Sequence, residues 1–439
     1  MNSLTESQHL AQEDLRYIWH PCTQMKDHEN FEIIPIKKAK GVWLEDFDGN
    51  HYIDAISSWW VNILGHSNAF INRAIKRQLN DFEHVILAGF THKPAVELAK
   101  KLVEISPNGL EKVFFADNGS SGIEVALKMS YHFFKNLGQN RPIFISLENS
   151  YHGETMGALA VSDVGIYKEA YEDLLLKSVQ VYAPKDKSKD ETNRALEALE
   201  SFLSLRANDV TALIIEPLVQ CAGSMMMHSS DYLSGVRSLT QKYGIFLIAD
   251  EVAVGFGRTG TLFACEQAAI TPDLMVLSKG LTGGYLPLSV VLCTQKIYDA
   301  FYCDYNPVRT FLHSHSYTGN ALACTAALAS IEYLEKYKII EKNKTKIKLM
   351  SKELARFDLL EIVKSTRQTG MICAIELDGF EGKRIGLAIA RLARTKHILL
   401  RPLGNVLYVM PPYVITKKEI SYLFGAIWDI LQDISNNQF

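Results

Sequence analysis

Six short β-rich runs recur between about residues 112 and 294, and they constrain the fold more than any other feature of the chain. The runs read KVFFAD, PIFISLE, ALIIEP, GIFLIAD, LMVLSKG and SVVLCT, and stretches with a helical pattern lie between them. This alternation is typical of a mostly parallel sheet that is covered by helices on both faces. We therefore predict an α/β fold built around such a sheet.

The residues that follow these apolar runs are polar. Ligands of open α/β sheets bind beside the carboxyl ends of the strands, so these residues are the first candidates for a site. In chain order they are Asp117, Asn118, Gly119, Ser120, Tyr151, His152, Glu216, Asp250 and Lys279. If the sheet is parallel, residues from distant parts of the sequence converge at one edge.

A glycine and serine turn, Gly119-Ser120-Ser121-Gly122, follows the first run and opens the helical stretch IEVALKMSYHFF. The first turn of a helix has unpaired backbone N–H groups that can bind a phosphate. An ordinary helix N-cap has a similar composition, so the turn alone leaves both interpretations open. No Gly-Lys-Ser/Thr follows, which excludes a Walker A loop.

A literal G-x-G-x-x-G pattern spans residues 255–260, shortly after the run GIFLIAD. A dinucleotide-binding fold requires an acidic residue about 20 positions further on, at the end of the next strand. The next run ends in Lys279 instead. The context therefore argues against a Rossmann site.

Asp250 and Lys279 each follow an almost wholly apolar run. A carboxylate there needs a cationic partner; a protonated pyridine nitrogen would serve, and a salt bridge to Arg258 or a helix cap is the alternative. A lysine there could form an imine with an aldehyde and then move protons, or it could simply be solvated. Together with a phosphate-binding turn upstream, the pair indicates a cofactor site.

Composition limits the class of protein. The formal charge of −3 and the absence of a Lys/Arg block favour small-molecule substrates over nucleic acid. The N-terminus is polar, and no apolar run approaches the roughly 18 residues of a membrane span, so we expect a cytoplasmic protein. Seven scattered cysteines without a CxxC pair indicate neither a disulfide framework nor a zinc site, and we expect no metal.

At 439 residues the chain is long enough for two or three domains. We expect residues 1–65 and 326–439 to build a smaller α+β domain from both chain ends, and residues 66–325 to form the large domain. GVWLEDFDGNHYID predicts a hairpin around Asp48-Gly49, and helices are expected after Gly319 and from Lys417.

Several longer motifs point to a known family. GSSGIEVALK, YHGET, IIEP, IADEVAVGFGRTG, PDLMVLSKGLTGG and SYTGN occur in the order found in class III aminotransferases. Within that class WHPCTQM, DAISSWWVNILGH, Ala253 and RPLGNVLYVMPPY resemble the adenosylmethionine-8-amino-7-oxononanoate aminotransferases, which make 7,8-diaminononanoate for biotin. The resemblance implies a fold-type I transferase that depends on pyridoxal 5'-phosphate.

The resemblance also implies roles for individual residues on the cofactor side. Gly119 and Ser120 would bind the phosphate, Tyr151 would stack on the ring, Asp250 would pair with the pyridine nitrogen, and Lys279 would be the Schiff-base lysine. Ser316 would complete the phosphate site from the other subunit, with His315 beside it as a further cofactor-binding residue. A shared site of this kind makes the expected active unit a homodimer.

On the substrate side the resemblance implies Trp59, Ser314 and Arg401 beside Tyr151 and Lys279, with Arg258 and Tyr408 as weaker candidates. An extended segment would turn one of Trp59 and Trp60 to the core and the other to the cleft, and the resemblance favours Trp59 for the cleft. This chain has Cys22 where many relatives have tyrosine, and Ser-His-Ser at 314–316 where some have Gly-Pro-Thr.

The implied reaction is a ping-pong transamination in which S-adenosylmethionine donates an amino group and 8-amino-7-oxononanoate accepts it. Lysine is an alternative donor. Other class III activities toward ω-amino acids or 4-aminobutyrate, an aminomutase or racemase, and a cofactor-binding protein without catalysis are the rival interpretations.

Overall fold

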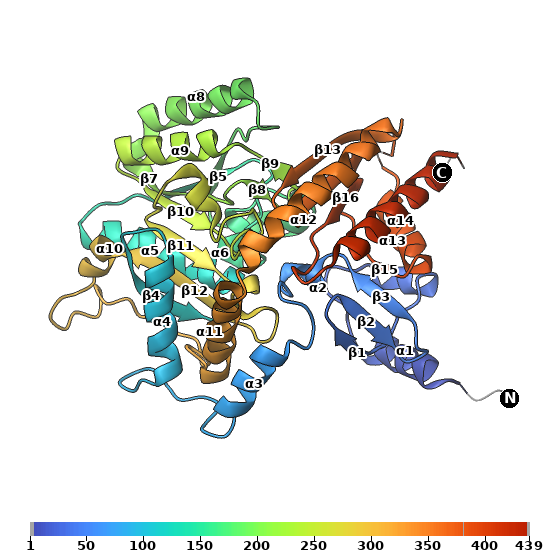
Figure 1. Ribbon diagram of the computed structural model, residues 1–439. Coiled ribbons are helices and arrows are strands. Elements are labelled where there is room, and N and C mark those ends of the chain that lie inside the picture. The colour runs from blue at the N-terminus through green and yellow to red at the C-terminus, as the bar shows by residue number, and fades with distance from the viewer. Residues whose placement is uncertain (1–3, 381, 437–439) are drawn as a thin grey trace.

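The computed structural model describes residues 4–380 and 382–436. A larger α/β part lies at the left of Figure 1, and a smaller part at the right contains the first and last described helices, α1 (Glu6–Tyr17) and α14 (Lys417–Asn436). Segments from opposite ends of the sequence therefore lie side by side in the smaller part.

The large part is built on a seven-stranded sheet with the strand order β4-β12-β11-β10-β7-β5-β6. Its strands are β4 (Leu110–Ala116), β5 (Ile143–Leu147), β6 (Ser178–Val181), β7 (Val210–Ile215), β10 (Phe246–Asp250), β11 (Leu274–Leu277) and β12 (Ser289–Thr294). Only β12 runs against its neighbours, β11 and β4, whereas β11, β10, β7, β5 and β6 pair in parallel. The prediction of a mostly parallel sheet is confirmed, and β6 is the strand that the sequence runs did not predict.

Alternate residues of the central strands enter two separate hydrophobic clusters. Ile214, Ile248 and Val276 pack with residues of α5 on one face of the sheet. The intervening Ala249 and Leu277 belong to the other cluster, which includes residues of α4, α8, α9 and α11. The helices are α4 (Lys93–Ile105), α5 (Gly119–Asn136), α8 (Lys189–Arg206), α9 (Ser230–Lys242) and α11 (Ala321–Lys336). Helices thus cover both faces, and the strands are buried on both sides.

The smaller part contains two sheets. The first has the order β1-β2-β3-β15, so a hairpin from the N-terminal region pairs with a strand near residue 398. The second is antiparallel, with the order β13-β14-β16. The strands are β1 (Ile36–Lys40), β2 (Trp43–Asp46), β3 (His51–Asp54), β13 (Val363–Thr369), β14 (Ile372–Leu377), β15 (Ile398–Leu399) and β16 (Val406–Val409), and the helices are α12 (Ile339–Leu354), α13 (Ile385–Thr395) and α14.

The predicted hairpin at Asp48-Gly49 and the helices after Gly319 and from Lys417 are present. The proposed boundary between residues 325 and 326 falls inside α11, which packs against α3 (Ala69–Gln78) and α4. The remaining short elements are α2 (Ser57–Trp60), α6 (Met156–Ala160), α7 (Gly165–Lys168), α10 (Gln295–Asp299), β8 (Val219–Gln220), β9 (Met226–Met227), η1 (Met25–Glu29), η2 (Glu169–Leu174), η3 (Ala207–Asp209), η4 (Ala264–Ala268), η5 (Lys279–Thr282) and η6 (Ala355–Leu359).

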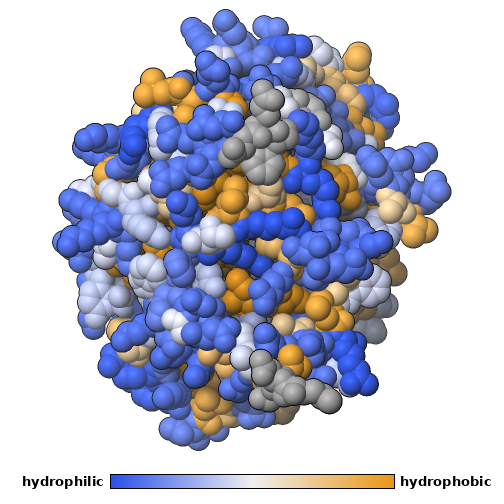
Figure 2. Space-filling model, turned by 90° about the vertical axis from the view of Figure 1, so that its right-hand side faces the viewer, coloured by the Kyte–Doolittle hydropathy of each residue, from blue (hydrophilic) through white to orange (hydrophobic). Residues whose placement is uncertain are grey.

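None of the helices that the structure describes is both long and apolar enough to cross a lipid bilayer. The face of the smaller part is mostly hydrophilic, and apolar side chains show between the polar ones near its middle (Figure 2).

Candidate active site

A cavity of about 450 Å³ lies at the carboxyl ends of the large sheet. The structure brings together there all the polar residues that follow the strands in the sequence. The lining residues include Asp117, Asn118, Gly119, Ser120, Tyr151, His152, Glu216, Asp250 and Lys279. The convergence expected from a parallel sheet is therefore present.

Lys279 follows β11 and begins the 3₁₀ turn η5, with a positive φ of 43°. A positive φ is costly for a residue with a side chain, and such conformations concentrate at functional sites. Burial lowers the pKa of the Lys279 amine, although Asp250 opposes this effect. Its Nζ lies 4.8 Å from the centre of the Trp60 ring, and no hydrogen-bond acceptor contacts it among the described residues. An amine with a lowered pKa and no partner is suited to nucleophilic attack and proton transfer.

Asp250 ends β10 with 5% of its surface exposed. Its Oδ2 lies 2.7 Å from Nδ1 of His152, and its Oδ1 accepts a hydrogen bond of 3.0 Å from the backbone N–H of Val252. The partner is therefore not Arg258, and the alternative of a salt bridge to that arginine is wrong. The carboxylate lines the cavity and is held in place by these contacts.

Arg258 lies in the core, with 1% of its surface exposed. Its guanidinium donates to the backbone carbonyls of Pro411 at 2.8 Å and Trp60 at 3.3 Å, and it lies over the Tyr413 ring. It belongs to the G-x-G-x-x-G segment, which forms a turn that packs against α12 and the Tyr413 hydroxyl. This turn does not line the cavity, so the argument against a Rossmann site stands.

Glu216 follows β7 and connects two loops at the cavity. Its two carboxylate oxygens accept hydrogen bonds from the backbone N–H groups of Tyr151, at 3.0 Å, and Cys221, at 2.9 Å. Burial raises the pKa of Glu216 to about 7. Glu216 thereby fixes the backbone of the loop that carries Tyr151 and His152.

The Tyr151 hydroxyl donates a hydrogen bond of 2.8 Å to Oε1 of Glu154. Its ring centre lies 5.3 Å from that of Tyr167, which comes from α7. Burial, with Glu154 as a further cause, raises the pKa of Tyr151. The ring is therefore neutral and held from two sides, as a stacking platform requires.

The turn that is predicted to bind phosphate is the N-terminus of α5. The Asn118 side chain caps the helix by accepting from the N–H of Ser121 at 3.0 Å. The N–H groups of Gly119 and Ser120 line the cavity and have no hydrogen-bond acceptor among the described residues. The interpretation as a helix cap is confirmed for Asn118, whereas phosphate binding by Gly119 and Ser120 stays a prediction.

Two glycines keep this turn accessible. A Cβ on Gly119 would lie 2.9 Å from Cγ1 of Val252, and one on Gly153, at φ 125°, would lie 2.1 Å from Oγ of Ser120. Unpaired N–H groups, a buried carboxylate and an amine without a partner fit the phosphate, the ring nitrogen and the aldehyde of pyridoxal 5'-phosphate.

The segment with Trp59 and Trp60 is a left-handed turn, since residues 57–60 all have positive φ. The expectation of an extended segment is wrong. The buried Asp54 carboxylate accepts from the N–H of Ser58 at 2.9 Å and from its hydroxyl at 2.7 Å, which closes the chain into a turn. The two indoles still point to different environments.

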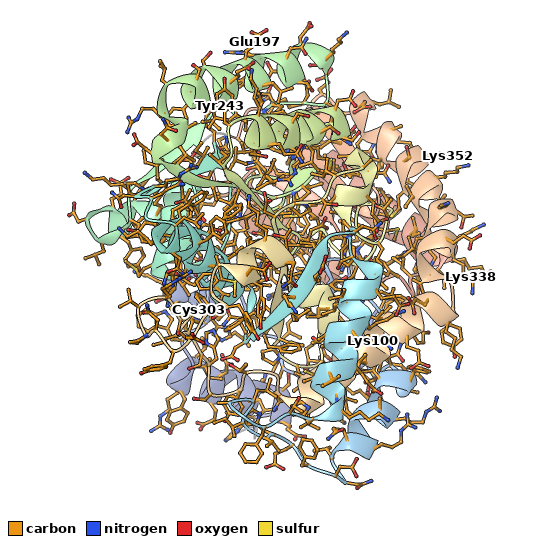
Figure 3. All side chains as sticks on the ribbon, turned by 90° about the vertical axis from the view of Figure 1, so that its left-hand side faces the viewer. Lys100, Glu197, Tyr243, Cys303, Lys338 and Lys352 are labelled. Carbon is orange, nitrogen blue, oxygen red and sulfur yellow. The ribbon has the colours of Figure 1, made fainter. Side chains whose placement is uncertain are left out.

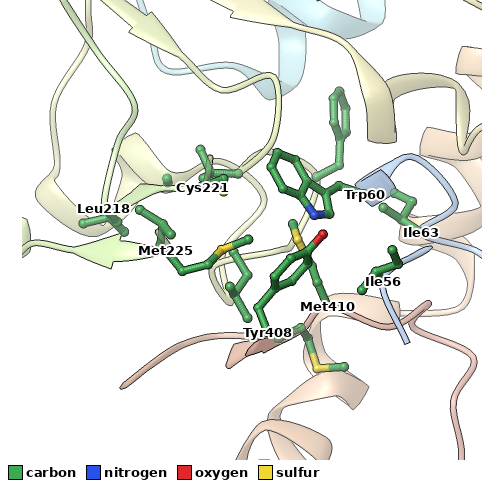
Figure 4. Packing of buried hydrophobic residues seen from close by; sticks show 14 of the residues in the cluster. Ile56, Trp60, Ile63, Leu218, Cys221, Met225, Tyr408 and Met410 are labelled. Carbon is green, nitrogen blue, oxygen red and sulfur yellow. The ribbon is translucent and has the colours of Figure 1, made fainter. Parts of the chain in front are cut away.

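Trp60 is buried, with its ring edge toward the Tyr408 ring at 6.0 Å, and it lines the cavity beside Lys279 (Figure 4). Trp59 is 37% exposed, and the Arg401 guanidinium lies 4.8 Å from its ring centre. The structure therefore places Trp60 at the cofactor side and Trp59 with Arg401.

A second, open cavity of about 1170 Å³ lies between the N-terminal segment, the α6–α7 region and the smaller part. It is lined by Cys22, Glu154, Tyr167 and Arg401, among others. The Cys22 Sγ lies 3.7 Å from Oε1 of Glu154, and Nη2 of Arg401 donates to the Cys22 carbonyl at 2.5 Å. Burial and Glu154 raise the pKa of the Cys22 thiol. The two cavities adjoin at the hydrogen-bonded pair Tyr151 and Glu154.

Ser314, His315 and Ser316 lie outside the first cavity, on the loop between α10 and α11. Ser314 and Ser316 are exposed, and Nδ1 of His315 lies 3.7 Å from Oδ2 of Asp117. Within one chain none of the three therefore lines the cavity, although His315 lies beside Asp117 at its edge. Their role in the site of a second subunit stays a prediction.

The sequence did not predict three contacts of the site. His152 pairs with Asp250, Glu154 pairs with Tyr151, and Tyr167 supplies a ring beside Tyr151. His152 and Glu154 lie in the YHGET motif, shortly after a β-strand, so their position in the sequence could have indicated a place in the site. Tyr167 does not follow a strand, and nothing in the sequence around it indicates a place in the site.

Known proteins resemble this chain over both its larger and its smaller part. The chain matches the family model described as aminotransferase class-III over residues 23–431. It is 47% identical over 433 residues to the adenosylmethionine-8-amino-7-oxononanoate aminotransferase of Helicobacter pylori, and the match covers 97% of this chain and 98% of that protein.

Solved structures agree with this match. The adenosylmethionine-8-amino-7-oxononanoate aminotransferase from Methanocaldococcus jannaschii superposes with a TM-score of 0.93 at 37% identity, over 97% of this chain and 99% of the other. The ω-transaminase from Pseudomonas jessenii in complex with PMP gives 0.92 at 26% identity, over 97% and 98%. The similarity therefore includes the elements that line both cavities.

Proposed function

This chain belongs to the class III aminotransferases, and from that premise we propose that it aminates 8-amino-7-oxononanoate to 7,8-diaminononanoate, a step of biotin biosynthesis. It is an aminotransferase that uses pyridoxal 5'-phosphate, the cofactor of its class. The observation that carries the choice of substrate is the second cavity, which is lined by Arg401 and by Glu154, the hydrogen-bond partner of Tyr151. The Trp59 ring packs against the Arg401 guanidinium. Whole-length identity of 47% to a relative with this activity in its name supports it.

On the cofactor side we propose roles that follow from the lining of the smaller cavity. When bound, the cofactor supplies a carbonyl that exchanges amines and a ring that withdraws electron density. Lys279 holds the cofactor and moves the proton at its Nζ, and Asp250 keeps the ring nitrogen protonated. Tyr151 packs on the ring, and the N–H groups of Gly119 and Ser120 bind the phosphate.

On the substrate side we propose Arg401 for the carboxylate of 8-amino-7-oxononanoate, because a guanidinium presents two parallel donors to a carboxylate. Trp59 packs beneath that guanidinium and covers the substrate chain. Ser314 is proposed to reach the substrate from a second subunit. S-adenosylmethionine is the proposed amino donor, with lysine as the alternative.

We propose that the active unit is a homodimer with a shared site, in which Ser316 and His315 reach the partner's cofactor. Large apolar side chains are exposed on and near the loop that carries them, as expected for a surface that a second copy covers. They include Ile86 at 59%, Phe90 at 67%, Tyr305 at 93%, Val308 at 79% and Leu312 at 74% exposure. We further propose that the enzyme acts in the cytoplasm, where its seven free cysteines stay reduced.

The substrate proposal is tested with the holoenzyme and single substrates. S-adenosylmethionine, lysine or 4-aminobutyrate is added separately, and the absorbance of the bound cofactor is followed. We expect S-adenosylmethionine to convert the cofactor and 8-amino-7-oxononanoate to restore it, with 7,8-diaminononanoate found by mass spectrometry. Conversion by 4-aminobutyrate alone would instead favour an ω-amino acid aminotransferase, and conversion by lysine alone would change only the donor.

A further inference from the structure

The loop of residues 300–320 carries the predicted phosphate ligand Ser316 and has no regular structure of its own. Cys303, near its beginning, is seen on the surface in Figure 3. Outside helix α5 the loop contacts His84, whose Nε2 lies 2.8 Å from the carbonyl oxygen of Ser316. The loop is also tied to one stripe of α5, where Lys128, His132 and Asn136 are spaced four residues apart and so share one face. Each of the three binds the loop at a different place.

Two of these ties hold the backbone of the loop. Nε2 of His132 donates to the carbonyl of Val308 at 2.8 Å, and the Asn136 amide donates to the carbonyl of Arg309 at 3.1 Å. Both lie several residues before the segment 314–316. They anchor the first half of the loop to α5.

The third tie is a chain of side chains that reaches the cofactor cavity. Nζ of Lys128 lies 2.8 Å from Nδ1 of His313, and Nε2 of His313 lies 3.2 Å from Nε2 of His315. Nδ1 of His315 then lies 3.7 Å from Oδ2 of Asp117, which lines the cavity beside the phosphate-binding turn. The chain thus runs from α5 through the loop to the end of β4.

The donor and acceptor roles in this chain follow from the first link. A lysine ammonium can only donate, so Nδ1 of His313 must accept, and the ring proton of a neutral His313 must be on Nε2. The Nε2–H group of His313 then donates to Nε2 of His315. The ring proton of a neutral His315 must therefore be on Nδ1, which faces the Asp117 carboxylate. The chain is therefore intact only while both imidazoles are neutral.

The surroundings of His313 favour the neutral ring. Burial, Lys128 and His315 lower the pKa of His313, and Glu124 on α5 opposes them. The Phe311 ring stacks on it at 5.9 Å, and Phe114 contacts it from β4. Acidification would protonate His313, which could then no longer accept from Lys128.

We propose that Lys128 and His313 are positioning residues for the cofactor, because they fix the 314–316 segment that completes the phosphate site of a second subunit. The inference rests on the proposed dimer with its shared site. It concerns retention of the cofactor and not the choice of substrate. Neither residue touches the cofactor cavity itself.

The test measures the rate at which dimeric holoenzyme releases pyridoxal phosphate after dilution, followed by the loss of protein-bound absorbance between pH 5.5 and 8.5. We expect wild-type release to be slow at pH 8 and to accelerate only on acidification beyond the ordinary histidine pKa of about 6.5, because the pKa of His313 is lowered. His313→Ala should release the cofactor about tenfold faster at pH 8, the effect of one charge-assisted hydrogen bond, and should lose the pH dependence. Lys128→Met should likewise release the cofactor faster at pH 8 and lose the acid transition, because the hydrogen bond that protonation of His313 breaks is already absent.

His132→Ala is the matched control, since it removes a hydrogen bond from the same stripe to the same loop but leaves the chain intact. Its release should match that of the wild type at every pH. The proposal is overturned if His313→Ala keeps the wild-type profile, if His132→Ala accelerates release as strongly, or if sedimentation shows that the wild-type holoenzyme is monomeric. Amino transfer by the wild type is assayed separately, so a wrong substrate would count against the proposed function without altering the release rates.

Discussion

The two cavities are built in different ways, although they adjoin at one hydrogen-bonded pair. The smaller cavity is formed by strand ends of a single sheet, and its charged residues Asp250 and Glu216 are buried and held by backbone N–H groups. The larger cavity is formed by three distant segments, and residues such as Cys22 and Arg401 meet there through side chains and one carbonyl. Rigid strand ends suit a cofactor that must not move, whereas a wall of separate segments can change to suit a substrate.

Removal of the amine from the smaller cavity should have the largest effect. Lys279→Ala should lower turnover by about 10³-fold or more, since in the proposed role it removes both the attachment of the cofactor and the proton carrier. Cofactor binding should persist in part, because the α5 N-terminus is untouched. Turnover and bound cofactor are measured on the same preparation.

The control for this variant is a second lysine whose pKa burial also lowers. Lys187 lines neither cavity, and its Nζ donates to the Thr369 hydroxyl at 2.7 Å. Lys187→Ala therefore removes a cation of the same kind away from the cofactor, and it should keep most of the turnover. Normal turnover of the Lys279 variant would refute the role of Lys279.

Substitution of Arg401, on the substrate side, should reduce activity less than loss of Lys279, and only for one of the two substrates. Arg401→Lys keeps the charge but loses the fork of donors, so we expect KM for 8-amino-7-oxononanoate to rise by about 10- to 100-fold. Conversion of the cofactor by the amino donor alone should change less. Steady-state kinetics with each substrate varied separately distinguish the two. An equal loss for both substrates would mean that Arg401 supports the fold of the wall and does not select the carboxylate.

The same contrast explains what the sequence could predict. Asp250 and Lys279 follow apolar runs in a parallel sheet, so topology alone brings them to one edge. Trp59 and Trp60 were expected in an extended segment, but the buried Asp54 closes them into a left-handed turn. A hydrogen bond from the backbone of Ser58 to the Asp54 side chain does not change the spacing of apolar residues, so the sequence pattern does not reveal the turn. The walls of the larger cavity depend on contacts between residues more than 100 positions apart, such as Arg401 with Cys22, which periodicity cannot reveal.

Burial of the carboxylate in the smaller cavity should be visible in the pH dependence of stability. Burial raises the pKa of Glu216 from 4.5 to about 7, so the folded chain binds more protons than the unfolded chain between these values. Its contribution to the free energy of unfolding is therefore complete below pH 4.5 and falls as pH rises through 7. The amide that Glu216→Gln introduces does not titrate in this range, so the variant lacks this contribution.

The Glu216→Gln comparison uses urea unfolding at several pH values from 5 to 8. The free energy of unfolding of the wild type minus that of Glu216→Gln should decrease over this interval. Glu154→Gln is the matched control from the larger cavity, because its carboxylate is exposed whereas that of Glu216 is buried. Its difference from the wild type should stay nearly constant. A constant difference for Glu216→Gln as well would show that this carboxylate is not desolvated.

The smallest effect is expected at Cys22, which lines the larger cavity. The Cys22 Sγ contacts Glu154 only at 3.7 Å, whereas the Tyr151 hydroxyl binds the same oxygen at 2.8 Å. Cys22→Ala should therefore change turnover and KM for the amino donor by less than about threefold, the effect of a weak surface contact. Tyr151→Phe, which removes the stronger hydrogen bond to the same carboxylate, should raise KM for the donor more. If instead Cys22→Ala has the larger effect, the thiol itself contacts the donor.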